Sequence, residues 1–318
     1  MRLLKLIPDN TNIDFVGIRF YAFAIDGLLV LLAAASLLFH GLNYGIDFTG
    51  GVLVEVKSAQ TIDIGAMRGQ VDSLGFPEAQ LQYFGGGDCD TPANSCVLIR
   101  VQPQANTNDQ QVAESIQMAL GSNYTFRRTE VVGPKVSGEL LSAGVWATVA
   151  AVFMIAFYVG IRFEWQYGVS AIIATGHDVF VTAGLYSLIG LDFTLTSVAA
   201  LLTLAGYSVN DTVVVFDRIR ENRRRYKRMT LRELVNLSTN QTLSRTVLTS
   251  CTTAISIIPL LLFGGPTLFD FSGAILFGIV VGTYSSIYVA GALLIYLPQV
   301  AGRDESAEAP MPRPGVTR

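Results

Sequence analysis

Three carboxylates lie inside strongly apolar stretches of this sequence: Asp26, Asp178 and Asp211. An ionisable side chain inside a membrane span is costly, so it usually faces a partner, a cavity or an ion route. In a low dielectric, an aspartate that gains and loses an arginine neighbour can release and bind a proton near neutral pH. Arg245 begins the apolar stretch that follows Asp211, so an antiparallel helix pair would bring these two side chains together. The pattern indicates proton transfer.

Each of these residues has a second interpretation. Asp211 could belong to a polar patch that holds helices together by hydrogen bonds, and Arg245 could be an interfacial anchor that reaches the headgroups. Three neighbours are expected to supply hydrogen bonds around Asp211: Ser208, Asn210 and Thr212.

The pair His177 and Asp178 fits helix packing and a second proton relay equally well. Asp26 lies within a turn or two of the end of its apolar stretch, so we expect it to be a tolerated residue at the membrane interface.

The elements that must position these residues are membrane helices. The chain has 318 residues, of which 51% are hydrophobic and only 15% charged, whereas soluble domains carry about 25% charged residues. A helix needs about 20 mostly apolar residues to cross the hydrocarbon core. Six such stretches are predicted as transmembrane helices in the bilayer: 20–39, 139–161, 165–190, 193–216, 245–264 and 270–297.

The basic residues indicate the orientation in the membrane. The predicted loop 217–243 carries eight Lys and Arg residues, whereas the connections on the opposite side carry none. By the positive-inside rule this loop is cytoplasmic, and an even number of spans puts both terminal segments, 1–19 and 298–318, on the same side. We expect a multi-pass protein of the bacterial inner membrane. The loop could also form an amphipathic helix at the membrane face.

Residues 40–137, between the first two spans, are too long and polar for a simple loop and predict a folded periplasmic domain. Periodicity and turn residues predict the order β-α-β-β-α-β of a ferredoxin-like α+β domain. The predicted elements are, in order, 51–57, 62–74, 79–84, 95–101, 108–120 and 124–132.

Cysteine and histidine usage argues against a metal centre. Three cysteines and two histidines occur without zinc-site spacing, so we predict no metal and no cofactor. Cys89 and Cys96 lie in a short loop of the predicted periplasmic domain, where an oxidising compartment favours a disulfide. Cys251, inside the fifth span, is expected to be buried. A net charge of −3 and the absence of a nucleic-acid-binding signature argue against a nucleic-acid partner.

Several segments together resemble the SecF subunits of the SecD/SecF family, a resistance-nodulation-division type of membrane protein. They are YGIDFTGG (44–51), VGPKVSGEL (132–140), HDV (177–179), GYSVNDTVVVFDRIREN (206–222), SRTVLTS (244–250), FGGP (263–266) and GTYSSIY (282–288). The resemblance implies an accessory subunit of the Sec translocon, SecYEG, that works with SecD. It implies use of the proton motive force in late-stage export of unfolded polypeptides. The family residues implicated in proton conduction correspond to Asp211 and Arg245.

Two other functions share some of these features. A proton-driven exporter half that moves a small molecule or lipid would also need an intramembrane carboxylate, but the outer domain is small for that. A non-conducting translocon scaffold would not need Asp211. An enzyme is not predicted, because the sequence carries no phosphate loop, nucleophile elbow or HExxH motif.

Overall fold

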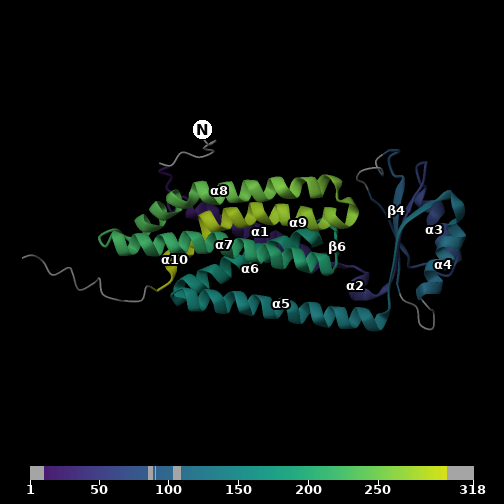
Figure 1. Ribbon diagram of the computed structural model, residues 1–318, viewed down its shortest axis with the longest axis horizontal. Helices are drawn as coiled ribbons and strands as arrows, with labels where there is room; N and C mark the ends of the chain where they lie inside the picture. Colours follow the sequence, from purple (N-terminus) through teal and green to yellow (C-terminus); the bar gives the residue numbers. More distant parts are fainter. Residues whose placement is uncertain (1–10, 85–88, 90, 103–108, 299–318) are drawn as a thin grey trace, which may run out of the picture.

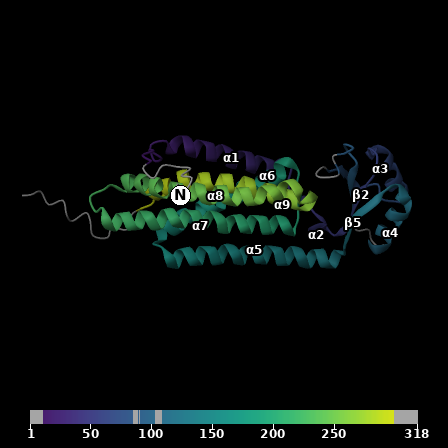
Figure 2. The same ribbon diagram turned by 45° about the horizontal axis from the view of Figure 1, so that its top comes forward.

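The computed structural model of this protein describes residues 11–84, 89, 91–102 and 109–298. A bundle of long helices makes up most of the molecule, and a small α+β domain lies at one end of it (Figure 1). The two parts remain end to end when the molecule is turned by 45° (Figure 2). One end of the bundle therefore faces the domain and the other points away from it.

Six helices in the described part are long and apolar enough to cross a membrane, which confirms the predicted fold class. They are α1 (Arg19–Phe39), α5 (Pro134–Arg162), α6 (Trp165–Ile189), α7 (Leu195–Arg225), α8 (Leu231–Phe263) and the span Leu268–Tyr296. The last span is built from α9 (Gly265–Ser285), a π-helical segment (Ser286–Ala290) and α10 (Gly291–Tyr296). The shortest helix, with 21 residues, still meets the length of about 20 that the hydrocarbon core requires.

The helices differ in how much surface they bury. The centre of the bundle is made by α6, α7 and the Leu268–Tyr296 span, whereas the most apolar part of α5 contains no fully buried residue. In both views α5 runs along one edge of the bundle (Figures 1 and 2). Trp146 and Phe153 are among its exposed apolar side chains. Since exposing apolar surface to water costs about 25 cal/mol per Å², α5 is suited to contact lipid or another protein.

The α+β domain has one four-stranded antiparallel sheet in the order β3-β4-β2-β5. Its elements are β2 (Gly51–Lys57), α3 (Ile64–Ser73), β3 (Gln80–Tyr83), β4 (Cys96–Val101), α4 (Asp109–Leu120), a 3-10 turn (Gly121–Asn123) and β5 (Thr125–Val132). This is the predicted ferredoxin-like arrangement. Apolar residues of one sheet face pack against α3 and α4, with Val54, Ile99 and Ile116 completely buried.

A short connection joins the domain to the bundle. Strand β1 (Asn43–Tyr44) pairs in parallel with β6 (Asp192–Phe193), which lies between α6 and α7. The one-turn helix α2 (Ile46–Thr49) then leads into β2 through Gly50 and Gly51. Gly51 has φ +112°, and a Cβ there would lie 2.2 Å from the carbonyl oxygen of Val101. Only glycine therefore fits at the start of the central strand.

The opposite end of the bundle differs from the predicted loop 217–243. Helix α7 continues to Arg225 and α8 already begins at Leu231, so that most of this segment is helical. The side chains of Thr230 and Glu233 cap each other's backbone amides at the start of α8, and this capping box begins the helix. Charged and long side chains do not end a helix, because they have good helix propensity.

Polar contacts hold the outer parts of α7 and α8 together. Asn222 donates hydrogen bonds to Ser238 (2.9 Å) and to Gln241 (2.8 Å).

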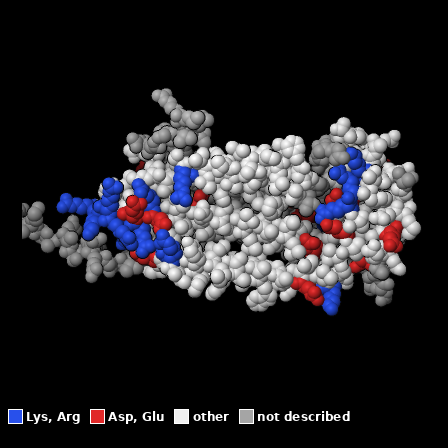
Figure 3. Space-filling view, viewed as in Figure 1, with Lys and Arg blue, Asp and Glu red and all other residues white. Residues whose placement is uncertain are grey.

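Basic side chains gather at this end, and other charged side chains lie near the α+β domain, with a wide uncharged band between them on the visible face (Figure 3). We call the α7–α8 end the basic end.

Candidate functional site

Asp211 lies on α7 inside the bundle and is only 3% exposed. Its Oδ2 atom is buried and has no hydrogen-bond partner. An unsatisfied carboxylate oxygen in a low dielectric is unfavourable, so this site favours binding of a proton or a cationic partner.

Arg245 is the nearest candidate for that partner. It lies on α8, which is antiparallel to α7, and it is close enough to interact electrostatically with Asp211. The two described side chains are not joined by an ion pair within 4.0 Å, and Arg245 is exposed at the surface of the bundle. The structure therefore places Asp211 and Arg245 near each other without an ion pair between them.

The three predicted polar neighbours do not hydrogen-bond to Asp211, which corrects the sequence-based expectation. Ser208 donates to Asp178 Oδ2 (2.5 Å), Thr212 contacts Ser286 (3.1 Å between hydroxyl oxygens), and Asn210 is exposed. Successive helix residues are rotated by about 100°, so the residues directly before and after Asp211 face other neighbours.

A second polar cluster lies in the bundle around His177 and Asp178 of α6. His177 Nδ1 lies 3.0 Å from Asp178 Oδ1. Asp178 is fully buried, and its Oδ2 atom accepts hydrogen bonds from Ser208 of α7 and Ser285 of α9 (2.8 Å). Three central helices thus converge on one carboxylate.

Asp26 belongs to the same cluster, and the expectation of an interfacial residue is wrong. It is 7% exposed, and its Oδ1 atom lies 3.6 Å from His177 Nε2. Apolar flanks alone cannot reveal which face of α1 packs inward. The sequence signal for this position was the rule that an acid within a membrane span usually faces a partner.

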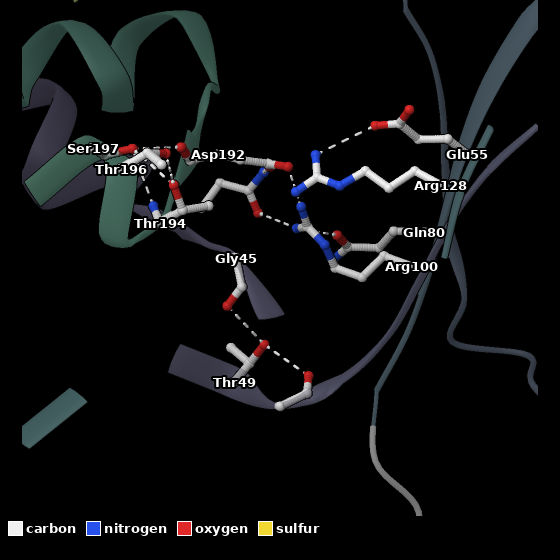
Figure 4. Close-up of polar contacts among 12 residues, drawn as sticks. Gly45, Thr49, Glu55, Gln80, Arg100, Arg128, Asp192, Thr194, Thr196 and Ser197 are labelled. Carbon is white, nitrogen blue, oxygen red and sulfur yellow. Dashed lines mark hydrogen bonds and ion pairs between the residues drawn. The ribbon is translucent and has the colours of Figure 1, made fainter. Parts of the chain in front are cut away.

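A third group of polar residues joins the α+β domain to the bundle (Figure 4). Arg100 of β4 forms an ion pair with Asp192 of β6, and Asn43 donates to the other carboxylate oxygen of Asp192 (2.7 Å). Arg100 is 6% exposed. Sequence analysis did not select these residues, because nothing in a single sequence relates positions 92 residues apart.

A cavity of about 810 Å³ lies between the open face of the sheet and the bundle. Charged residues of β2, β4 and β5 line it together with Asp192 and apolar residues such as Leu53 and Leu262. Glu55 lines the cavity wall beside Arg128, and burial raises the pKa of the Glu55 carboxyl group although Arg128 opposes this effect. The junction is therefore polar and partly hollow.

The cysteines have different environments. The structure joins Cys89 and Cys96 by a disulfide, and Arg127 donates to the Cys89 sulfur (3.1 Å). Cys251 is exposed on the bundle surface, contrary to the expectation of a buried residue. Its helix, α8, leaves most of its apolar face uncovered, which explains the difference.

Comparisons with known proteins agree over nearly the whole chain. The family described as "Protein export membrane protein SecD/SecF, C-terminal" matches residues 112–300, and the "SecD/SecF GG Motif" matches residues 35–62. The chain is 45% identical over 303 residues to protein translocase subunit SecF of Cereibacter sphaeroides, with 92% of each chain covered. Protein translocase subunit SecF of Pseudomonas aeruginosa is 42% identical over 287 residues, which cover 90% of this chain and 92% of that protein.

Solved structures of SecDF have the same fold. The crystal structure of SecDF, a translocon-associated membrane protein from Thermus thermophilus, is 39% identical, with a TM-score of 0.81 over 92% of this chain. SecDF in a super-membrane-facing form is 40% identical, with a TM-score of 0.65 over 90% of this chain. The chain spans 39% of the length of each of these SecDF chains. On this evidence the chain belongs to the SecF family of protein translocase subunits.

Proposed function

We propose that this chain conducts protons as an accessory subunit of the Sec translocon and, with SecD, uses the proton motive force in late-stage export of polypeptides. One observation carries the proposal. Asp211 is buried within an apolar bundle, has an unpartnered carboxylate oxygen, and lies near a guanidinium that is not yet paired with it.

The Asp211–Arg245 arrangement suits reversible proton binding. When Arg245 approaches, the ionised carboxylate is stabilised and releases its proton; when Arg245 withdraws, the low dielectric favours the protonated acid. The current gap between the two side chains represents the withdrawn position. A proton can thus bind in one conformation and leave in another.

The available energy is sufficient to move a protein domain. One charge crossing 100 mV contributes about 2.3 kcal/mol, and two conformers of a protein commonly differ by a few kcal/mol. The α7 helix that carries Asp211 begins directly after β6, which pairs with β1 of the domain connection. A shift of α7 would therefore reach the α+β domain through a short, hydrogen-bonded path.

The charge distribution supports one orientation. Basic residues gather at the basic end (Figure 3), which by the positive-inside rule faces the cytoplasm. The α+β domain then lies in the periplasm, where a disulfide such as Cys89–Cys96 is stable, and the membrane is the bacterial inner membrane.

The partners follow from the same family. SecD is the expected heterodimer partner, because this chain matches only 39% of the SecDF chain to which it is similar. The uncovered apolar surface of α5 supports a partner or lipid on that edge of the bundle. The SecYEG translocon and the unfolded polypeptide in transit complete the proposed assembly.

The proposal is tested by Asp211→Asn and, separately, Arg245→Met in membrane vesicles that carry the full translocon. We expect the secretion that an imposed proton gradient stimulates to disappear, while protein level and complex assembly persist. Asp217→Asn and Arg232→Met are matched controls, because they remove exposed charges from the same two helices. Normal stimulation in the Asp211→Asn variant would reject proton conduction in favour of a scaffold.

A further inference from the structure

The cluster around His177 contains more hydrogen-bond acceptors than donors. Asp178 accepts from two serine hydroxyls, as an ionised carboxylate does, and its Oδ1 atom faces His177 Nδ1 at 3.0 Å. If Asp178 is ionised, it can only accept, so that Nδ1 carries a hydrogen and Asp178 orients the ring. The other ring nitrogen, Nε2, therefore points away from Asp178.

Nε2 faces Asp26 across 3.6 Å. Both oxygens of Asp26 and Nε2 itself are buried without a hydrogen-bond partner. If Asp26 were ionised and the imidazole neutral, lone pairs of the Asp26 carboxylate would face the lone pair of His177 Nε2 inside the bundle. This arrangement is unfavourable. A proton between them, on either atom, removes the repulsion.

In the described part of the chain, the cluster lacks a compensating basic side chain. Among the described residues, no lysine or arginine contacts Asp26, His177 or Asp178. The titratable group that faces the cluster from α9 is Tyr284, whose hydroxyl donates to the Ala22 carbonyl (3.1 Å). The elements α7 and α9 otherwise contribute serine hydroxyls. Two carboxylates and a neutral imidazole carry two negative charges, and one shared proton leaves a single negative charge.

We propose that Asp26, His177 and Asp178 form a second proton-binding site in the bundle, with one exchangeable proton shared between Asp26 and His177. As a relay position it rests on the proposed function, because the proton it holds would come from the same gradient. The site is distinct from Asp211, which interacts electrostatically with Arg245 of α8 and with none of these three residues through a hydrogen bond.

Hydroxyl groups line the contact between α7 and α9, between the two sites. Asp178 is bonded to Ser208, one turn before Asp211, and to Ser285. The next residue, Ser286, contacts Thr212, the neighbour of Asp211. A hydroxyl both accepts and donates a proton, so it can pass a proton without a net change in charge.

The backbone at this contact is also unusual. The π-helical segment begins at Ser286, immediately after Ser285. Such segments are rare and frequently lie at functional sites. A proton transfer between these groups needs no other reactant, because an N–H or O–H bond breaks at one group and forms at the next.

Histidine NMR tests the site directly. The sequence contains only two histidines, His40 and His177, and His40 is exposed. Full-length protein in lipid nanodiscs, with isotope-labelled histidine and the substitution His40→Gln, gives signals from His177 alone. We expect these signals to titrate between about pH 5 and 9.

The substitution Asp26→Asn is the decisive variant. Loss of a carboxylate at this distance should move the midpoint of the His177 titration by about one pH unit or more. Asp26→Glu, which keeps the charge, should restore a midpoint closer to that of the wild type and guards against a purely structural effect. Asp217→Asn, remote on α7, should leave it unchanged. The proposal is overturned if the chemical shift of His177 changes neither with pH nor in the Asp26→Asn variant.

Vesicle assays separate this site from the function of Asp211. We expect Asp26→Asn to lower gradient-stimulated secretion, because a shift of one pH unit in the His177 midpoint is about a tenfold change in proton affinity. If Asp211→Asn abolishes stimulation while Asp26→Asn changes neither secretion nor the His177 signal, the second site is rejected and proton conduction stands. If Asp211→Asn has no effect, conduction is rejected, and the NMR titration still decides whether the second site binds a proton.

Discussion

The ion pair between Arg100 and Asp192 allows a sharp test of how the α+β domain is held against the bundle. We predict that Asp192→Asn loosens the connection between β1 and β6 without unfolding either part. The carboxylate of Asp192 accepts from Arg100 and, through its other oxygen, from Asn43. The asparagine keeps the size of the side chain but removes the charge and one acceptor.

The magnitude follows from the burial of the two partners. Removing one partner of a fully buried ion pair costs about 3–5 kcal/mol, whereas exposed pairs contribute about 0–1 kcal/mol. The Arg100 side chain is 7% exposed and the Asp192 side chain 20% exposed, so the pair lies between these cases. We therefore expect a loss of about 2 kcal/mol, which corresponds to roughly a 30-fold change in the opening equilibrium.

Hydrogen exchange of backbone amides measures that equilibrium. The Gly45 amide donates to the Phe193 carbonyl (2.9 Å), and the Leu195 amide donates to Asp47 (2.9 Å). In Asp192→Asn, peptides that contain these two amides should exchange about 30-fold faster, because local opening limits their exchange. Peptides from the sheet core should be unaffected.

Two results would refute this reasoning. The first is unchanged exchange at Gly45 and Leu195 in Asp192→Asn. The second is equal acceleration in Arg68→Met, which removes an arginine that contacts Ala79 within the domain and should leave the connection intact. The double variant Arg100→Met with Asp192→Asn should cost less than the sum of the two single changes, since both remove the same interaction.

Two further predictions concern stability. Because burial raises the pKa of Glu55 in the folded domain, the folded state binds its proton more tightly than the unfolded state, and domain stability should fall as the pH rises above about 4.5. Glu55→Gln should flatten this slope in urea-dependent pulse proteolysis of the full protein; an unchanged slope would contradict the assignment. A Cβ at Gly184 would lie 2.3 Å from the Ala33 Cβ, whereas one at Gly176 would meet nothing. Gly184→Ala should therefore cost about 1–3 kcal/mol, seen as a lower thermal transition in detergent, and Gly176→Ala little; equal effects would count against close α1–α6 packing.

The sequence predicts where the helices and strands lie more accurately than which of their faces are buried. The strand 51–57 is found with these same bounds, because alternating β-branched residues are bounded by glycine and by a polar segment. The helices α7 and α8 extend further than hydropathy indicates, since apolar content measures the fit to lipid and not the end of the helix.

Contacts between distant segments depend on rotation and register, which one sequence does not contain. Proximity of Asp211 and Arg245 could be anticipated, because two antiparallel helices joined by a short turn must lie side by side. The burial of Asp26 against His177 could not, since it depends on which face of α1 meets α6. The pairing of Arg100 with Asp192 likewise requires the positions of two separate parts of the molecule.

The lengths of α7 and α8 have a mechanical consequence. Helices of 31 and 33 residues measure about 46 and 50 Å, well beyond a hydrocarbon thickness of about 30 Å, so their joined ends must project from the bilayer. Asp211 lies 14 residues before the end of α7, and Arg245 lies 14 residues after the start of α8. Asp211 and Arg245 therefore lie at the same distance from the turn that joins the two helices. A change in the angle between α7 and α8 at this turn would alter the distance between the two side chains.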